Sequence, residues 1–158
     1  MGTNISHPEL IEKLNTKTLI IEGLVTIIAV VAFVLSWKIT GIFLLVLGVS
    51  YFFLNSKQEV YEPTGSIVKK HSYYFDRDNT VQLAKIVKGN ISEDTEAYKL
   101  VNSGSARMDV VASEDMEFFA AQLFRFVPHT YEPETELIIY TGPKAKEMSQ
   151  YLERCKKA

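Results

Sequence analysis

The sequence is poor in the residues that build metal and nucleophilic sites. It contains one cysteine, Cys155, and three histidines that lie far apart in the chain. A single cysteine excludes an internal disulfide framework and any zinc site made of cysteines. No histidine pair has the spacing of a metal-binding motif, and His71 and His129 fit ordinary strand and loop positions. We therefore expect no metal ion and no other cofactor.

The motifs of phosphate binding and of nucleophilic catalysis are also missing. The chain has no G-x-x-x-x-G-K, no G-x-G-x-x-G and no G-x-S-x-G segment. Its acidic groups, at 93–96, 114–117 and 132–136, fall at expected helix starts and turns, where solvated acids are common, and none has the pattern of a calcium loop. Cys155 lies on the apolar face of the expected last helix, which favours a buried hydrophobe over a nucleophile. We name no catalytic residue.

Positive charge is not in excess either. The formal net charge is −2, so the basic surface typical of nucleic-acid-binding proteins is absent and no nucleic-acid partner is expected. Hydropathy divides the chain into two unlike parts. Residues 19–54 are almost entirely apolar, whereas residues 55–158 carry 14 Lys and Arg and 16 Asp and Glu. The chain is long enough for one modest domain and an anchor.

Between Gly23 and Ser56 the apolar part contains one charged residue, Lys38, in the segment LSWKITG. A single helix over 19–54 would be about 54 Å long at ~1.5 Å per residue. The hydrocarbon core of a bilayer is only about 30 Å thick. Two transmembrane helices, at 19–36 and 39–54, avoid this mismatch and place Trp37 and Lys38 in a turn at the membrane surface. The sequence therefore predicts a transmembrane hairpin.

Two other interpretations of the apolar part are less favoured. A secretory signal peptide would have a shorter apolar region and a small-residue cleavage site, whereas a second apolar run follows directly here. A buried helical pair in a soluble protein would need more chain to cover it than the remaining residues provide. The lipid bilayer is therefore an expected partner of this chain.

Lysines near the ends of the hairpin set its expected orientation. Lys13, Lys17 and Lys57 flank the termini of the hairpin, while the turn carries Lys38 alone. Positive residues favour the cytoplasmic side, so the N-terminal segment 1–18 and the C-terminal domain are predicted to be cytoplasmic. Within that segment, Ser6-His7-Pro8-Glu9 has the pattern of a helix start. The chain is therefore predicted to be a multi-pass protein of a cell membrane.

Small residues recur along both helices of the predicted hairpin. Such stripes allow close helix packing, either inside the hairpin or in a homo-oligomer, and packing inside the hairpin requires no second chain. Glu22 lies about one turn inside the first helix, where its side chain can reach the membrane interface or face a partner, and we favour the interface over a role in transport. The expected packing residues are Ala29, Ala32, Ser36, Gly41 and Gly48.

The polar part consists of a connector at 55–65 and a domain at 66–158. Alternating aromatic and β-branched residues predict strands, and Gly89 follows a helical pattern as a left-handed stop. The domain is predicted to be a small α+β fold with an antiparallel sheet and the element order β-α-α-β-β-β-α. The elements are strands at 66–75, 106–112, 118–127 and 136–141, and helices at 78–88, 92–104 and 143–156.

Residues 118–127 allow two interpretations. Met116, Phe119, Leu123 and Phe126 have a helical spacing. Aromatic residues nevertheless occur on both sides of the segment, and the preceding strand ends only a short turn away. We favour a central strand whose two faces are both covered.

The stretch AAQLFRFVPHTYEPET at 120–135, with a two-helix hairpin before it and a closing helix after it, resembles a group of small bacterial inner-membrane proteins of unknown function. That resemblance covers most of the chain. It implies a two-helix anchor followed by a small cytoplasmic domain, and it implies a bacterial inner membrane as the location. It supplies no activity and no catalytic residues.

These observations favour a membrane-tethered interaction or regulatory module with a protein partner. In this hypothesis the hairpin holds the domain beside the bilayer, and a face of the sheet or of a helix contacts the partner. An accessory subunit of a larger membrane complex, bound mainly through the hairpin, is the alternative. An enzyme on a membrane-proximal substrate is less favoured, because no catalytic set is visible in the sequence.

Overall fold

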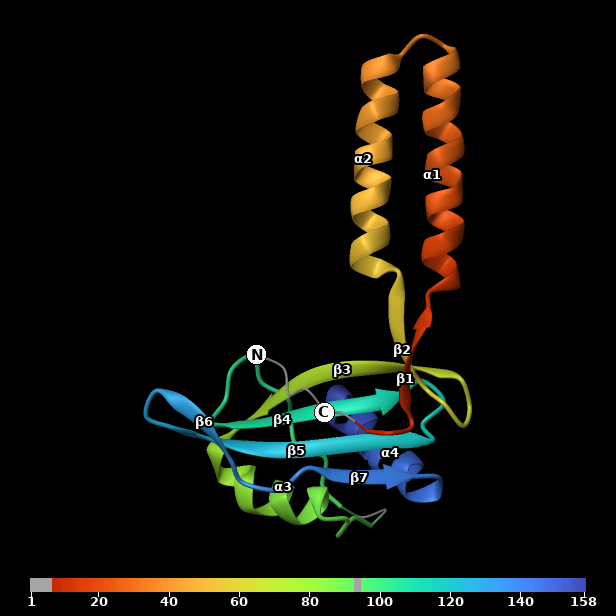
Figure 1. The fold of residues 1–158 in the computed structure, drawn as a ribbon. Helices are drawn as coiled ribbons and strands as arrows, with labels where there is room; N and C mark the ends of the chain where they lie inside the picture. Colours follow the sequence, from red (N-terminus) through yellow and green to blue (C-terminus); the bar gives the residue numbers. More distant parts are fainter. Residues whose placement is uncertain (1–6, 93–94) are drawn as a thin grey trace. The chain divides into compact units, whose positions relative to one another are not determined.

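A computed structural model describes residues 7–92 and 95–158, which form two compact units (Figure 1). One unit is Ile11–Val60, and the other combines the N-terminal residues up to Leu10 with Tyr61–Ala158. The expected capping role of Ser6 and the acidic residues Glu93 and Asp94 lie outside the described residues.

The first unit is built on two antiparallel helices, α1 (Thr16–Val34) and α2 (Lys38–Asn55). The Asn15 side chain caps α1 by accepting a hydrogen bond from the Lys17 backbone N–H at 3.1 Å. Ser36 adopts a left-handed conformation, with φ of 64°, in the three-residue turn between the helices. Both helices are long and apolar enough to span a membrane.

Two short strands extend the hairpin beyond its open end. These are β1 (Leu10–Leu14) and β2 (Lys57–Tyr61). The Asn15 backbone N–H donates to the Ser56 carbonyl at 2.8 Å, and Lys57 forms a 2.9 Å ion pair with Glu12. The predicted helix start near Pro8 is therefore wrong, because this segment makes a turn and then enters β1.

The domain in the second unit is an antiparallel sheet with two helices. Its central strands are β3 (Ser66–Phe75), β4 (Ala106–Ser113) and β5 (Phe118–Val127), in that order. The other edge of β5 pairs with β6 (Thr130–Pro133) near its C-terminal end and with β7 (Ile138–Thr141) near its N-terminal end.

Helices α3 (Thr80–Val87) and α4 (Pro143–Lys157) pack on the same face of this sheet. A short 3-10 turn at Arg77–Asn79 leads into α3, and Gly89, with φ of 90°, follows its end. Apolar side chains alternate toward this face along the strands, as the two-residue period of a strand requires. The main core contains Phe75, Leu83, Val87, Met108, Phe119, Leu123, Met148, Tyr151 and Leu152.

The opposite face of the sheet carries a second, smaller apolar cluster. Tyr61 and Phe118 lie with ring centroids 5.1 Å apart, and His7 lies 5.6 Å from the same Phe118 ring. Val68, Val111 and Ala120 complete this cluster. Both faces of the middle of β5 are thus covered, which explains why its sequence is apolar at successive positions.

The strand predictions at 66–75 and 118–127 are confirmed. The predicted helix from Ser92 to Gly104 is wrong over its described part. Val101 instead forms an isolated bridge with Tyr74, where its N–H donates to the Tyr74 carbonyl at 3.0 Å. The predicted element order also needs correction, because β1 precedes the helices, β2 lies in the predicted connector at 55–65, and β6 lies between two predicted strands.

Candidate functional site

The small residues expected to pack the hairpin divide into two groups. Ala29, Ala32, Gly41 and Gly48 are buried between the helices. Ser36 is exposed in the turn. Trp37 and Lys38 are exposed at the same end, and Lys38 is the first residue of α2 rather than part of the turn.

Glu22 of α1 faces α2 rather than turning toward a helix end, contrary to our expectation. A Cβ atom placed on Gly48 would lie 2.8 Å from Glu22 Oε1, so the glycine leaves the room that the carboxyl group occupies. Glu22 Oε2 is buried and has no hydrogen-bond partner among the described residues. Gly41 plays a similar steric part opposite Phe33, whose ring would lie 2.8 Å from an added Cβ.

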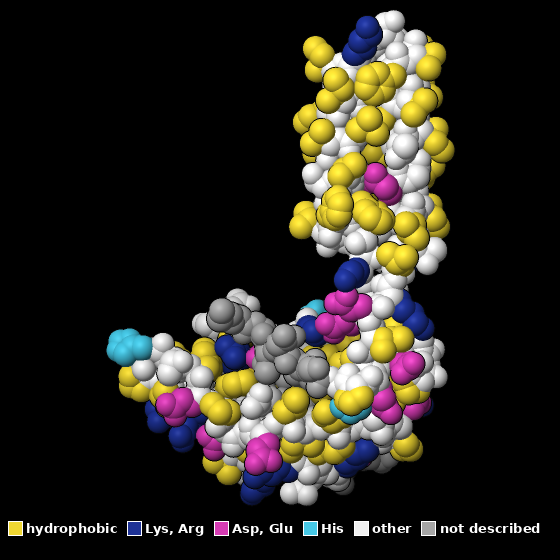
Figure 2. Space-filling model, viewed as in Figure 1, with side chains coloured by type: hydrophobic (Ala, Val, Ile, Leu, Met, Phe, Trp, Pro, Cys, Tyr) yellow, Lys and Arg dark blue, Asp and Glu magenta, His cyan; other side chains and the backbone are white. Residues whose placement is uncertain are grey.

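The outward surfaces of the two units differ in chemistry. Hydrophobic side chains cover the helical pair, whereas Lys, Arg, Asp and Glu gather over the domain (Figure 2). Large apolar residues of the helices are strongly exposed: Ile39 is 86% exposed and Leu54 is 83% exposed. Water is a poor solvent for such a surface, and lipid is a good one.

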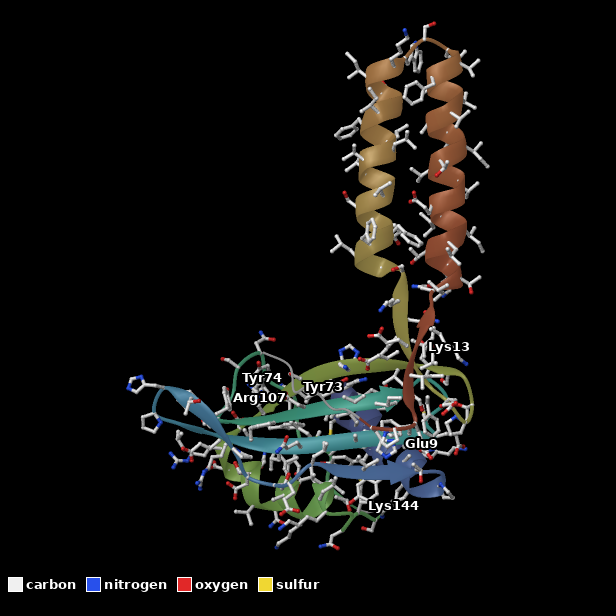
Figure 3. The ribbon with its side chains drawn as sticks, in the orientation of Figure 1. Glu9, Lys13, Tyr73, Tyr74, Arg107 and Lys144 are labelled. Carbon is white, nitrogen blue, oxygen red and sulfur yellow. The ribbon has the colours of Figure 1, made fainter. Side chains whose placement is uncertain are left out.

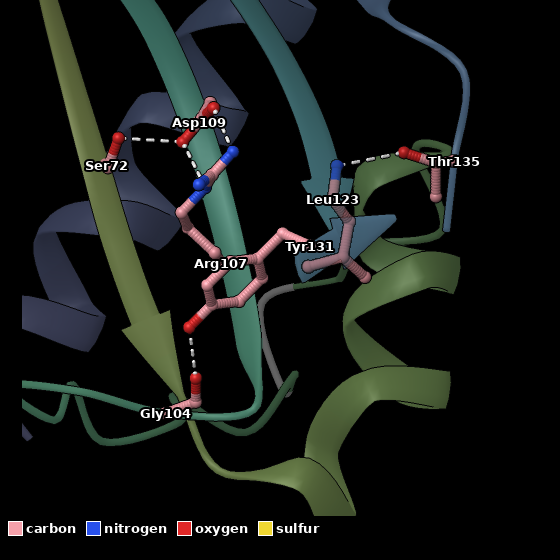
Figure 4. A network of polar contacts seen from close by, with 7 residues as sticks. All are labelled: Ser72, Gly104, Arg107, Asp109, Leu123, Tyr131 and Thr135. Atoms are coloured by element: carbon pink, nitrogen blue, oxygen red, sulfur yellow. Dashed lines mark hydrogen bonds and ion pairs between the residues drawn. The ribbon is translucent and has the colours of Figure 1, made fainter. Parts of the chain in front are cut away.

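A polar network lies on the sheet face opposite α3 and α4 (Figure 4). Arg107 Nε lies 3.1 Å from Asp109 Oδ1, and the Ser72 hydroxyl donates to the same carboxylate at 2.7 Å. The guanidinium group also lies 4.6 Å from the Phe124 ring and 4.7 Å from the Tyr131 ring. Arg107 Nη2 also donates to Asp109 Oδ2 at 3.1 Å, so the network links β3 to β4 and packs against Phe124 of β5.

A cavity of about 300 Å³ opens between α4 and the sheet, and we call it the α4 pocket. Its floor is apolar and comes from Val110, Phe119 and Leu152. Polar and charged side chains surround this floor. They are Lys69, His71, Tyr73, Ser113, Glu114, Ser149, Glu153 and Lys156. Small-molecule sites in proteins usually have this composition of apolar walls and a few placed polar groups.

Ser149 is the unusual residue of the α4 pocket. Its side chain is buried, at 7% exposed, and its Oγ has no hydrogen-bond partner among the described residues. Leaving a buried hydroxyl unpaired costs about 1–3 kcal/mol. Neighbouring Met148 and Leu152 are apolar and belong to the core, so an alanine at 149 would fit the local packing better.

Lys156 closes the other end of the pocket on α4. Its Nζ donates to Glu153 at 2.6 Å and lies 5.3 Å from the centre of the Tyr73 ring (Tyr73 is labelled in Figure 3). Burial alone would lower the pKa of Lys156, but the hydrogen bonds with Glu153 and Tyr73 outweigh it and raise that pKa. Lys69 forms a 2.8 Å ion pair with Glu114 at the rim.

The cysteine and the histidines considered as reactive groups or metal ligands lie at ordinary structural positions. Cys155 is buried, and burial raises the pKa of its thiol, so little reactive thiolate forms at neutral pH. His71 is exposed on β3 at the α4 pocket, and His129 lies in the turn between β5 and β6 with φ of 74°. Within 7–92 and 95–158, no three His, Cys, Asp or Glu residues are placed to hold a metal ion.

Sequence reasoning missed the α4 pocket. Ser149 is one polar position within an apolar helical stripe, and only the strands packed against it reveal that its hydroxyl lies at a cavity. Comparison with protein-family models, with curated proteins and with solved structures finds no match to this chain.

Proposed function

We propose that this chain is a membrane-tethered interaction module. In this proposal α1 and α2 cross the bilayer, the turn near Lys38 lies outside, and the domain is held on the cytoplasmic side, where it meets a protein partner. The observation that carries the proposal is the contrast between an outward apolar surface on the helices and a charged surface on the domain.

The distribution of charge along the hairpin supports this placement. Lys38 is the only Lys or Arg at the turn, and Lys13, Lys17 and Lys57 lie at the other end. Cytoplasmic loops are enriched in positive residues. Most large apolar side chains on both helices are exposed, and the buried positions between the helices include the small residues Ala29, Ala32, Gly41 and Gly48.

The core of the domain supports a role for it separate from the hairpin. The cluster between the sheet and helices α3 and α4 contains Phe75, Phe119 and Tyr151 at 1% exposed or less. This cluster uses no residue of the hairpin. A domain with its own core can present a constant surface to a partner while the hairpin fixes its location.

A hairpin exchange tests this function against the accessory-subunit alternative. The chain, cross-linked in cells and purified in mild detergent, is compared with a variant whose residues 16–55 are replaced by an unrelated two-helix hairpin of equal length. We expect both proteins to retain the same cross-linked partner, because the domain makes the contact. Loss of that partner from the exchanged variant would instead assign the contact to the hairpin and contradict the proposal.

A further inference from the structure

We propose that the α4 pocket binds a small, elongated organic molecule with a neutral hydroxyl group at one end and a carboxylate at the other. The residues that line the pocket belong to β3, β4, β5, α4 and the turn between β4 and β5, all within the domain. The inference is therefore independent of the membrane placement and of the identity of any protein partner.

The unpaired hydroxyl of Ser149 fixes one end of this ligand. A serine hydroxyl can donate one hydrogen bond and accept others. Burying an ion beside it would be costly, because an isolated charge loses its hydration there. A neutral ligand group that donates and accepts, such as a phenolic or alcoholic hydroxyl, satisfies Ser149 Oγ at the lowest cost.

Lys156 fixes the other end. Ser149 and Lys156 are seven residues apart and therefore lie on one face of α4, separated by about 10.5 Å along the helix at ~1.5 Å per residue. Leu152 lies between them and forms part of the apolar floor. An ammonium group has three donors, so Lys156 can bind a ligand carboxylate while its bond to Glu153 persists.

The strands line the pocket along its length. On β3 the pocket residues run from Lys69 through His71 to Tyr73. The β4 partners of Lys69 and His71 are Ala112 and Val110, so the middle of the floor is apolar. At the Lys69 end the ammonium group is ion-paired with Glu114 at 2.8 Å, and at the other end Lys156 of α4 lies 5.3 Å from the Tyr73 ring centre. A flat or extended apolar body fits between these ends.

The probe for this inference is 3-(4-hydroxyphenyl)propanoate, which carries a hydroxyl and a carboxylate at opposite ends of an apolar body. Two related molecules isolate each end: 3-phenylpropanoate lacks the hydroxyl, and tyramine has an ammonium in place of the carboxylate. Binding is measured by ligand-observed NMR with the full chain in lipid nanodiscs, and empty nanodiscs give the background.

We expect 3-(4-hydroxyphenyl)propanoate to bind about three- to tenfold more tightly than 3-phenylpropanoate, the ratio that one added hydrogen bond provides. Tyramine should bind more weakly than both. In Ser149→Ala the advantage of the hydroxylated probe should vanish, while the affinity for 3-phenylpropanoate stays the same. An equal loss of affinity for both carboxylate probes in that variant would overturn the inference. Absence of binding of either probe to the unmodified chain would overturn it as well.

A pair of lysine variants tests the other end. Lys156→Gln should weaken the binding of both carboxylate probes severalfold. The matched control is Lys144→Gln at the start of the same helix (Figure 3). Lys144 is 36% exposed and ion-paired to Glu147, and Lys156 is 37% exposed and ion-paired to Glu153, but only Lys156 lines the pocket. Equal effects of the two substitutions would contradict a carboxylate site at Lys156.

The thermal stability of Ser149→Ala separates a binding role from a structural one. Because the serine hydroxyl is buried without a partner, its removal should leave the melting temperature unchanged or raise it. A fall in melting temperature of the ligand-free variant would mean that the hydroxyl stabilises the fold, and would remove the reason for placing a ligand group there.

Discussion

The two units of this chain bury opposite kinds of side chain. In the hairpin the buried positions are small, such as Ala29 and Gly48, and the large apolar side chains point outward. In the domain the buried positions are large, such as Phe75 and Tyr151, and charge points outward. In our proposal this difference reflects two solvents, lipid around the hairpin and water around the domain.

The same contrast changes what each residue contributes. Burial of a large side chain from water stabilises the domain by about 1.5–3 kcal/mol per residue. Between helices in lipid this term is absent, and close backbone approach matters more. Glycine therefore allows close helix packing in the hairpin, whereas large apolar side chains fill the core of the domain.

The largest expected effect comes from removing a domain core side chain. Phe75 is fully buried, so Phe75→Ala should lower the free energy of unfolding of the domain by about 3–5 kcal/mol. Ile39→Ala, on the exposed surface of α2, should change it by less than about 0.5 kcal/mol. Urea unfolding of the full chain in micelles, followed by circular dichroism, measures both. Similar losses in the two variants would refute the contrast between the units.

Breaking the buried ion pair should have the next largest effect. Asp109 is 4% exposed and pairs with Arg107, so Asp109→Ala leaves a poorly hydrated guanidinium and should cost about 3 kcal/mol. The control is Glu114→Ala, whose partner Lys69 is exposed, with an expected cost below about 1 kcal/mol. The same urea unfolding measures both variants, and equal costs would show that burial does not decide the strength of these pairs.

In the hairpin, the expected effect depends on which glycine is replaced. Gly48→Leu should separate the helices, because its side chain would overlap Glu22 and Val25, with a cost of about 1–3 kcal/mol. Gly23→Leu is the matched control, since an added Cβ there meets nothing within 4 Å. SDS titration followed by the fluorescence of Trp37, the single tryptophan, reports on the turn. Equal midpoints for the two variants would contradict the observed helix contact.

The smallest expected effect is alkaline loss of domain stability. Burial raises the pKa of Cys155 and of Tyr140, so the unfolded chain releases these protons at lower pH than the folded chain. Their contribution is complete below about pH 8.5 and is lost as pH rises toward the folded-state pKa values, by at most about 1.4 kcal/mol per pH unit for each group.

Urea unfolding between pH 7 and pH 11 tests this dependence. Cys155→Ala should raise the pH at which domain stability begins to fall, toward the tyrosine range near pH 10. An unchanged onset in Cys155→Ala would exclude the thiol as its source.

The sequence predicts the elements that local pattern determines. Gly89 marks the end of α3, and alternation predicts β3 with its observed bounds. The helix expected at 92–104 does not form, because residues of this segment make tertiary contacts in a non-helical conformation. Gly104 lies directly against the Phe75 carbonyl, where an added Cβ would overlap it, and Val101 bridges Tyr74. Helical spacing alone does not distinguish these two outcomes.

The remaining failures have the same physical origin. Strand β1 depends on hydrogen bonds to residues more than forty positions away. Directly before the strand, for example, the Glu9 carbonyl accepts a hydrogen bond from the Glu62 backbone N–H at 2.8 Å. No local pattern encodes such a partner. The α4 pocket likewise exists only because Ser149 packs against strands that precede it in the chain. The hairpin could be predicted because its length and hydropathy are properties of the local sequence.

The most direct test of the central proposal is the accessibility of single cysteines to a membrane-impermeant thiol reagent. Cys155 itself is a poor reporter, because it is 1% exposed and burial raises its pKa. In a Cys155→Ala background, Thr40→Cys places an exposed thiol in the first turn of α2, and Lys157→Cys places one at the exposed end of α4.

In intact cells we expect Thr40→Cys to be labelled and Lys157→Cys to be labelled only after the membrane is opened. This result would follow from a hairpin that crosses the bilayer and a domain held on the cytoplasmic side. Labelling of Lys157→Cys in intact cells, or protection of both positions until the membrane is opened, would contradict that account.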